Sequence, residues 1–124
     1  MLMKFIDLFA GLGGFHIALS RLGHECVFAS EIDANLCDVY NQNFKILPEG
    51  DIRHIKVENI PDHDILCAGF PCQPFSKAGD QKGFKDPNSG DLFSYVMKIV
   101  QYHKPSYIIL ENVPNIERHD NGST

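Results

Sequence analysis

The residues with the clearest chemical potential are a cysteine between two prolines and a glutamate that ends an apolar run. Cys72 lies in the stretch 69–76, Gly-Phe-Pro-Cys-Gln-Pro-Phe-Ser, directly after the largely apolar segment 64–68. Proline fixes its own φ angle and drives the preceding residue toward extended geometry, so this loop is stiff. A stiff loop at the carboxyl end of a strand holds one thiol at the sheet edge where ligands bind. This setting favours Cys72 as a nucleophile over the usual role of cysteine as a small buried hydrophobe.

Glu111 is the second candidate for a role in catalysis. It follows four apolar residues at the end of the predicted strand 106–110, at the same sheet edge as Cys72. A carboxyl group that loses solvent at such an edge holds its proton more tightly and can donate it in a reaction. The alternative is a structural glutamate bonded to the neighbouring backbone.

A glycine turn after the apolar segment 4–9 is a candidate ligand site. The turn 11–14, Gly-Leu-Gly-Gly, lets a ligand approach the backbone and opens a helix whose N-terminus favours an anion. Glu31 comes twenty residues after Gly11, where an acidic side chain would hold ribose hydroxyl groups. The turn lacks the full G-x-G-x-x-G pattern of nicotinamide enzymes, and a tight strand–helix connection without a ligand is the alternative for the turn alone. Together with Glu31 and the pair Asp51-Ile52, it favours an adenosine-bearing ligand.

These residues need a scaffold in which strands and helices alternate. Apolar runs predict strands at 4–9, 26–30, 64–68 and 106–110, with a further short strand ending near 51–52.

Three helices are predicted between these strands. The first helix ends at Gly23, Asp33 caps the second, and Asp91 caps a third that ends before Pro105. The apolar stripe of the first helix is Phe15, Ala18, Leu19 and Leu22. Such alternation predicts an α/β fold with a Rossmann-like, doubly wound, mostly parallel sheet.

Composition narrows the class of protein. With 124 residues, 44% of them hydrophobic, the chain forms at most one globular domain. Neither a signal peptide nor an apolar run of the ~20 residues that span a membrane is visible, so we expect a cytoplasmic protein. The net charge of −5 argues against a dedicated nucleic-acid-binding module. The four cysteines, at positions 26, 37, 67 and 72, do not match a zinc site or a disulfide framework, so we predict no metal and interpret the first three as core residues.

Three segments resemble motifs of the DNA (cytosine-5) methyltransferases. Segments 7–14, 69–73 and 111–113, which read Asp-Leu-Phe-Ala-Gly-Leu-Gly-Gly, Gly-Phe-Pro-Cys-Gln and Glu-Asn-Val, are similar to motifs I, IV and VI in residues, order and spacing. The resemblance extends over essentially all 124 residues and is greatest to short bacterial enzymes of restriction–modification systems. It implies the S-adenosylmethionine-dependent methyltransferase fold, S-adenosylmethionine as cofactor, and double-stranded DNA with a flipped cytosine as substrate.

The resemblance also implies a role for each site residue. Cys72 would add covalently to C6 of the cytosine, and Glu111 would hydrogen-bond or protonate N3, so that C5 can accept the methyl group. Glu31 would hold the cofactor's ribose. The full set of implied cofactor contacts is Phe9, Gly11, Gly13, Glu31, Ile32, Asp51, Ile52, Pro71 and Leu92.

Two departures from the family pattern qualify the resemblance. Ile32 stands where similar bacterial enzymes often carry a tryptophan that stacks on adenine. The family also continues past Glu-Asn-Val with a Gln-x-Arg-x-Arg motif, a target-recognition domain and a C-terminal helix, none of which is present in residues 1–124. We therefore expect the N-terminal portion of a catalytic domain, incomplete at its C-terminal side, with an uncovered apolar edge strand.

The sequence leaves three hypotheses open. In the first, the chain is a piece of a longer polypeptide or one half of a split enzyme, and in both cases it needs the remainder for activity. A relative that methylates cytosine in RNA would carry the same cysteine motif. A non-catalytic module that binds cofactor or regulates a partner is the third alternative, against which the presence of both Cys72 and Glu111 argues.

Overall fold

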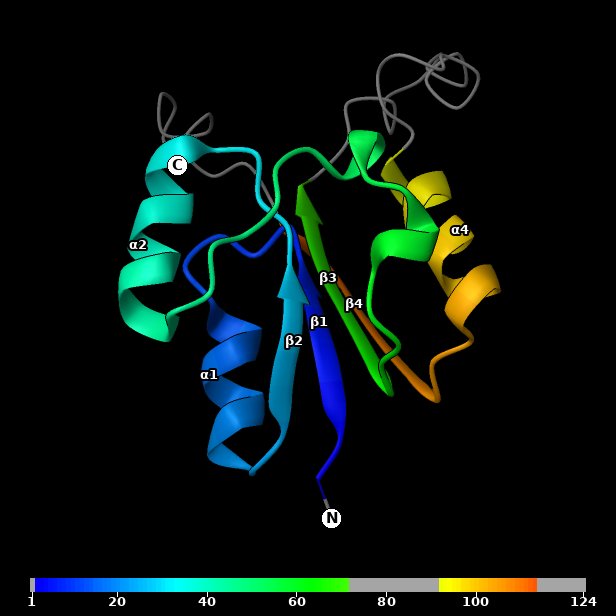
Figure 1. The fold of residues 1–124 in the computed structure, drawn as a ribbon, viewed down its shortest axis with the longest axis horizontal. Coiled ribbons are helices and arrows are strands. Elements are labelled where there is room, and N and C mark those ends of the chain that lie inside the picture. The colour runs from blue at the N-terminus through cyan, green and yellow to red at the C-terminus, as the bar shows by residue number, and fades with distance from the viewer. Residues whose placement is uncertain (1, 72–91, 114–124) are drawn as a thin grey trace.

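The computed structural model describes residues 2–71 and 92–113, which form a parallel sheet between two layers of helices (Figure 1). In chain order the elements are β1 (Lys4–Leu8), α1 (Gly14–Arg21), β2 (Glu25–Ala29), α2 (Ala34–Phe44), the short 3-10 helices η1 (Ile52–His54) and η2 (Val57–Asn59), β3 (Ile65–Pro71), α4 (Leu92–His103) and β4 (Tyr107–Val113). The strand order is β2-β1-β3-β4, and every neighbouring pair is parallel. The predicted doubly wound α/β fold is confirmed.

The two faces of the sheet bury different residues because side chains alternate along each strand. On the face covered by α4, Ile6, Leu8, Leu66 and Ala68 pack with Val96 and Ile99. On the face covered by α1, Phe5, Ile65 and Cys67 form a second cluster. Burying a valine or isoleucine side chain such as Val96 or Ile99 stabilises the fold by about 1.5–3 kcal/mol.

Local sequence signals explain where the helices begin. The Asp33 carboxylate accepts hydrogen bonds from the backbone N–H groups of Asn35 at 2.9 Å and Leu36 at 3.1 Å, so the predicted N-cap of α2 is confirmed. Gly13, with φ of 88°, precedes α1. The predicted cap at Asp91 lies outside the described residues.

The apolar stripe predicted for α1 is only partly correct. Phe15 and Leu19 pack against the sheet, but Ala18 is exposed and Leu22 is 71% exposed. The buried residue of this helix is His16. The helix is shorter than the stripe suggests, since it ends at Arg21 and leaves Leu22 outside.

The short strand predicted near 51–52 is wrong. The chain makes only an isolated parallel bridge between Ser30 and Glu49 and then turns into η1. The Asp51 carboxylate caps this turn by accepting the backbone N–H of Arg53 at 2.9 Å, and Ile52 enters the core at 5% exposure. A capping aspartate followed by a core-anchoring isoleucine therefore produces a 3-10 turn here, and the described sheet has four strands instead of five.

Two further predictions need correction. Glu111 lies inside β4, which continues to Val113, and not after the end of the strand. Of the cysteines interpreted as core residues, Cys67 is buried, whereas Cys26 and Cys37 are only half-buried. No helix within the described ranges has the length and apolar character needed to cross a membrane.

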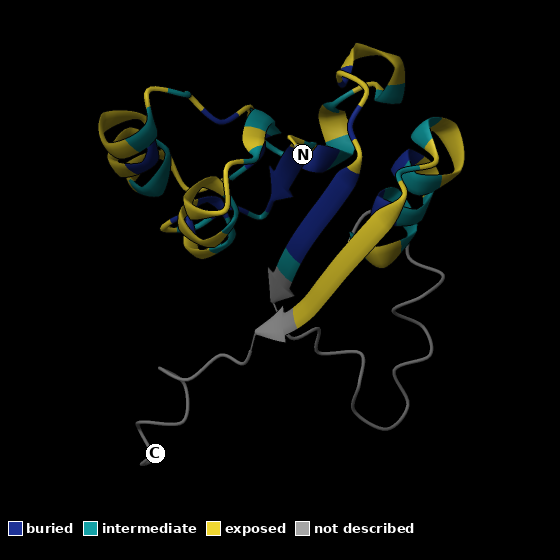
Figure 2. Ribbon diagram, turned by 90° about the horizontal axis from the view of Figure 1, so that it is seen from below, coloured by how far each residue is buried: buried dark blue, intermediate teal, exposed yellow. Residues whose placement is uncertain are grey.

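Strand β4 is the exposed edge of the sheet (Figure 2). Its residues Tyr107, Ile108, Ile109 and Leu110 are 39–56% exposed, although all are hydrophobic. The paired residues of β3, Ile65 to Ala68, are at most 5% exposed. Because exposure affects consecutive residues of β4, side chains on both faces of this strand are exposed, as expected from the sequence.

Candidate functional site

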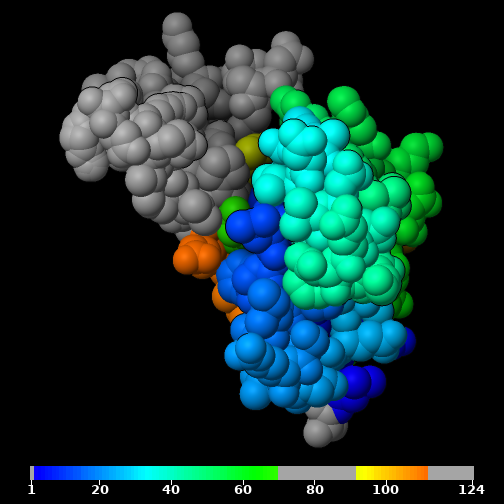
Figure 3. All heavy atoms as spheres, turned by 90° about the vertical axis from the view of Figure 1, so that its left-hand side faces the viewer, coloured from blue at the N-terminus to red at the C-terminus, as the bar shows by residue number. Residues whose placement is uncertain are grey.

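The candidate site lies where the chain changes direction across the sheet. From β1 the chain first continues to β2 on one side and later crosses to β3 on the other, so β1 and β3 flank a topological switch point. Open α/β sheets bind ligands at the carboxyl ends of the strands at such a point. A cavity of about 430 Å³ opens there, lined by Phe9, Ala10, Gly11, Gly14, Phe15, Gly69 and Glu111. Figure 3 shows the end of β4 beside the end of β3 and the segment around the glycine turn.

The register between β3 and β4 brings Glu111 to this cavity. Gly69 pairs with Glu111, and neighbouring residues of parallel strands in register point to the same face. Because Gly69 has no side chain, space remains beside the Glu111 carboxyl group. Pro71, the last residue of β3, pairs with Val113. Cys72 is the next residue in the chain and lies outside the described residues, as do the side chains of Pro71 and Val113.

The glycine turn is closed on one side and open on the other. Gly13 has φ of 88°, and a Cβ atom there would lie 2.3 Å from Cε2 of Phe44, so only glycine fits. Gly11 has φ of 56°, and no atom lies within 4 Å of the position that its Cβ would take. The same space is open at Gly14. The turn thus packs tightly against α2 and leaves room for a ligand on the side of the cavity.

Glu31 fastens the glycine turn to the end of β2. Its Oε1 accepts the backbone N–H of Gly11 at 2.8 Å, and its Oε2 accepts that of Asp33 at 3.0 Å. Each carboxylate oxygen has two lone pairs, so the half-buried group can still accept hydroxyl donors. The structure therefore places Glu31 against Gly11, which lines the cavity together with Phe9 and Glu111.

Among the described residues, the other predicted cofactor residues, Glu31 and Gly13 included, do not line this cavity. The Asp51 carboxylate is held by the Arg53 guanidinium, at 3.0 Å from Nε and 2.6 Å from Nη2, and these hydrogen bonds lower the pKa of Asp51 to about 2. Ile52 is buried in the core. Ile32 is 68% exposed. Leu92 is partly buried and packs against the core cluster on the α4 side of the sheet.

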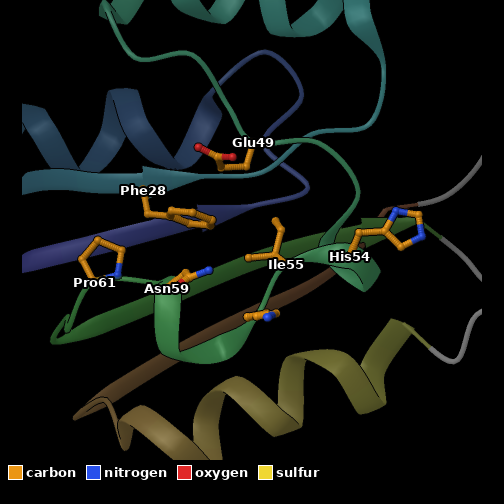
Figure 4. A pocket seen from close by; sticks show the side chains of 7 residues that line it. Phe28, Glu49, His54, Ile55, Asn59 and Pro61 are labelled. Atoms are coloured by element: carbon orange, nitrogen blue, oxygen red, sulfur yellow. The ribbon is translucent and has the colours of Figure 1, made fainter.

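A second cavity lies on the opposite face of the sheet (Figure 4). Its volume is about 490 Å³, and its lining residues are Phe28, Glu49, His54, Ile55, Lys56, Asn59 and Pro61. It is larger than the first cavity but contains none of the predicted catalytic or cofactor residues. We therefore place the candidate site at the switch point.

Sequence reasoning missed two residues that shape the switch-point cavity. Phe15 was assigned only to the apolar stripe of α1, and Gly69 only to the loop before the cysteine. Extending the predicted strand past residue 68 would have pointed to Gly69, because a glycine inside a buried strand often marks the close approach of a ligand or of another backbone.

Curated relatives of this chain are Type II methyltransferases. The Type II methyltransferase M.HhaI of Haemophilus parahaemolyticus is 54% identical over 122 residues, which are 98% of this chain and 37% of that protein. M.DsaV of Dactylococcopsis salina is 50% identical, over 98% of this chain and 34% of the relative. The chain spans about a third of the length of the curated relatives it matches.

Solved structures with the same fold are also methyltransferases. The crystal structure of S. pombe Dnmt2 methyltransferase matches with a TM-score of 0.71 and 27% identity, over 94% of this chain and 38% of that one. The family model for C-5 cytosine-specific DNA methylase matches residues 3–124, essentially the whole chain. The resemblance inferred from the three motifs is thereby confirmed, and the chain belongs to the C-5 cytosine-specific DNA methylase family.

Proposed function

We propose that the protein carrying this chain transfers a methyl group from S-adenosylmethionine to C5 of cytosine in DNA, as part of a restriction–modification system. The observation that carries the proposal is the convergence of the glycine turn, Gly69 and Glu111 on one cavity at the switch point. The close relatives are Type II methyltransferases, which supports the assignment to modification of DNA. DNA as the substrate also agrees with the cytoplasmic location expected from the sequence.

The residues around the glycine turn fit an adenosine-bearing cofactor. The open sides of Gly11 and Gly14 leave space for it, and Glu31 presents a carboxylate beside them. When bound, S-adenosylmethionine supplies an electrophilic methyl group. In this proposal Phe9, Gly11 and Gly13 line the cofactor, Glu31 holds its ribose, Ile32, Asp51 and Ile52 meet its adenine, and Pro71 and Leu92 pack beside it.

Asp51 can meet adenine only in a restricted way. Its carboxylate is already bound to Arg53, so it has lone pairs but little freedom to move. The Ile52 side chain points into the core, and therefore its backbone is the group available to a ligand. Exposed Ile32 offers an apolar surface next to Glu31.

The reacting residues in this proposal are Cys72 and Glu111. C5 of cytosine is a weak nucleophile, and addition of the Cys72 thiolate to C6 makes C5 electron-rich enough to take the methyl group. Glu111 hydrogen-bonds or protonates N3 of the base, which stabilises the charge that develops as the thiolate adds. The C5 proton then leaves, and the thiolate is eliminated from C6. The base must first leave the duplex, which costs about a few kcal/mol.

In this proposal, the remainder of the protein binds the DNA backbone and reads the bases. The chain carries a net charge of −5, and phosphate contacts need Lys and Arg side chains. Contacts with the DNA backbone and the reading of base edges are therefore assigned to a part beyond these 124 residues, in the same polypeptide or in a partner.

The acceptor of the methyl group tests this proposal. The complete protein is incubated with S-adenosylmethionine labelled in its methyl group and with duplex DNA, the same DNA containing 5-methylcytosine in place of cytosine, or tRNA. We expect label only in unmodified DNA, because C5 must be free to accept the group. Transfer to tRNA alone would favour the RNA-directed alternative. Cofactor binding without transfer to any acceptor would favour the non-catalytic module.

Glu31→Ala should weaken binding of S-adenosylmethionine to the complete protein by about 1–3 kcal/mol, the cost of losing hydrogen bonds to a charged group. Part of that loss comes from the backbone N–H groups of Gly11 and Asp33, which lose their acceptor. Isothermal titration calorimetry measures the affinity. Glu25→Ala, at the exposed opposite end of β2, is the matched control. Equal affinity of the Glu31→Ala and Glu25→Ala proteins would refute the role proposed for Glu31.

A further inference from the structure

A buried chain of polar side chains lies beneath the glycine turn. Asp7, His16 and Tyr40 are 1%, 8% and 0% exposed, and they come from β1, α1 and α2. The Tyr40 hydroxyl donates a hydrogen bond to Oδ2 of Asp7 at 3.0 Å. Nδ1 of His16 lies 2.7 Å from the same hydroxyl oxygen. One hydroxyl group therefore joins three elements that meet at the base of the turn.

The glycine turn rests directly on the rings of this cluster. A Cβ atom on Gly13 would lie 3.2 Å from Cε2 of Tyr40 and closer still to Phe44. The His16 ring stacks on Phe44 with a centroid distance of 3.9 Å and an interplanar angle of 15°. The position of these rings thus sets the position of Gly13.

Backbone hydrogen bonds extend the same support to the open side of the turn. The Asp7 carbonyl accepts the N–H of Ser30 at 3.0 Å, and the Ser30 carbonyl accepts the N–H of Ala10 at 2.8 Å. The next residue, Glu31, holds Gly11 through its side chain. A shift of Asp7 would consequently reach both ends of the turn.

The protons of the hydrogen-bond chain formed by Asp7, Tyr40 and His16 can be arranged in two ways. In each arrangement every one of the three side chains keeps its hydrogen-bond partner. With Asp7 ionised, Tyr40 donates to it and His16 donates to Tyr40 through Nδ1–H. With Asp7 protonated, Asp7 donates to Tyr40, and Tyr40 donates to a bare Nδ1 of His16. In going from the first arrangement to the second, a proton adds at Nε2 of His16, its Nδ1 proton passes to Tyr40, and the hydroxyl proton of Tyr40 passes to Asp7.

We propose that Asp7, Tyr40 and His16 are positioning residues, whose buried hydrogen-bond chain fixes the glycine turn against α2 and so sets the affinity of the cofactor site. This inference rests on the proposed function, because it concerns the site assigned to the cofactor. None of the three side chains lines the switch-point cavity, so they act on it through Gly13 and Gly11.

The buried hydrogen-bond chain of Asp7, Tyr40 and His16 also makes the stability of the folded protein depend on pH, in two opposing ways. Burial raises the pKa of Asp7 to about 7, with the Tyr40 hydrogen bond opposing this and the negative charge of Glu31 adding to it. Burial lowers the pKa of His16. The ionisable groups that face Asp7 from the packed elements are Tyr40 and His16, Cys26 on β2, Cys67 on β3, and Glu31 after β2.

The signs follow from linkage between proton binding and folding. Because the pKa of Asp7 is higher in the folded than in the unfolded state, its contribution to stability falls as the pH rises from about 4 through 7. Because the pKa of His16 is lower in the folded state, its contribution falls as the pH drops below its ordinary value of 6.5. Asp7→Asn, which cannot ionise, should remove the first loss, so its melting temperature should gain on that of the wild type as the pH rises from about 4 to 7.

Tyr40→Phe is the direct test of positioning, because it keeps the ring under Gly13 and removes only the hydroxyl group. In the complete protein we expect the Kd for S-adenosylhomocysteine, used as a probe, to rise about tenfold, the effect of leaving a buried charged partner unpaired. The KM for S-adenosylmethionine should rise in proportion, with kcat at saturating cofactor retained. Tyr102→Phe, an exposed tyrosine on α4, is the matched control.

Each outcome has a distinct meaning. Unchanged Kd in Tyr40→Phe, with a wild-type pH profile of stability in Asp7→Asn, would overturn the positioning role and leave the proposed function intact. A wild-type protein that does not bind the probe would overturn the proposed function and this inference with it. If Tyr40→Phe does not fold, Asp7→Asn decides: its pH profile must differ from that of the wild type, and its Kd must change across pH 6 to 8 less than the wild-type Kd does.

Discussion

Cys72→Ala should lower methyl transfer by the complete protein by about 10⁴-fold or more, the scale on which loss of a nucleophile acts in other covalent enzymes. Without the thiolate, C6 receives no electron pair and C5 stays too weak a nucleophile to take the methyl group. Cofactor affinity should change little, because the proposed cofactor contacts lie around the glycine turn. Label transferred to DNA, measured alongside calorimetric cofactor binding, separates the two effects.

DNA containing 5-fluorocytosine provides a test of the covalent bond itself. After methyl transfer, fluorine at C5 cannot leave as a proton does, so the protein should stay attached to the DNA and migrate as an adduct in a denaturing gel. Cys37→Ala, a half-buried cysteine on α2, should still form the adduct and serves as the control. Glu111→Gln should form it more slowly. An adduct that persists in Cys72→Ala would remove this cysteine from the mechanism.

The second large effect concerns the 124-residue chain alone, which we expect not to methylate DNA. Its net charge of −5 gives little attraction to phosphates, which supply most of the non-specific affinity of DNA-binding proteins. Its edge strand β4 exposes four consecutive hydrophobic residues and therefore favours self-association. The chain also spans only 37% of the length of M.HhaI.

Complementation can measure this dependence. The purified chain is assayed by itself and after addition of a separately produced polypeptide that carries the remaining motifs of the family. We expect activity only in the mixture, with a loss of self-association of the chain when the two combine. A control mixture containing Cys72→Ala should stay inactive although the two parts still associate. Robust methyl transfer by the chain in a preparation free of any second polypeptide would contradict the prediction.

The residues proposed for the site can be recognised in the sequence because their signals are local. A glycine turn after a strand, an acidic residue twenty positions later, and a glutamate late in another strand all fall at carboxyl ends of parallel strands, which meet at one edge. The N-cap at Asp33 was predictable for the same reason, since a cap depends on residues two and three positions away. The sequence assigns Gly11 and Glu31 to the same ligand, but the hydrogen bond between them is visible only in the structure.

The features that sequence reasoning missed depend on distant partners. Tyr40 is 33 residues from Asp7 and 24 from His16, and no local pattern announces that the three side chains meet. One hint was a charged residue, Asp7, between the apolar residues Ile6 and Leu8. The wrongly predicted strand near Ile52 also reflects distant partners. Ile52 packs in the core cluster on the α4 side of the sheet, and this packing competes with pairing to a strand.

The position of β1 in the middle of the sheet has a consequence for synthesis. Phe5 of β1 pairs on one side with Cys26 and on the other with Ile65. At about 5–20 residues per second, a ribosome needs roughly 3–12 seconds to advance along the chain from Phe5 to Ile65. During this interval β1 and β2 can form a parallel pair with α1, but one edge of β1 stays without its hydrogen-bonding partner. The nascent chain therefore exposes to other chains the very edge that the finished sheet places at its centre.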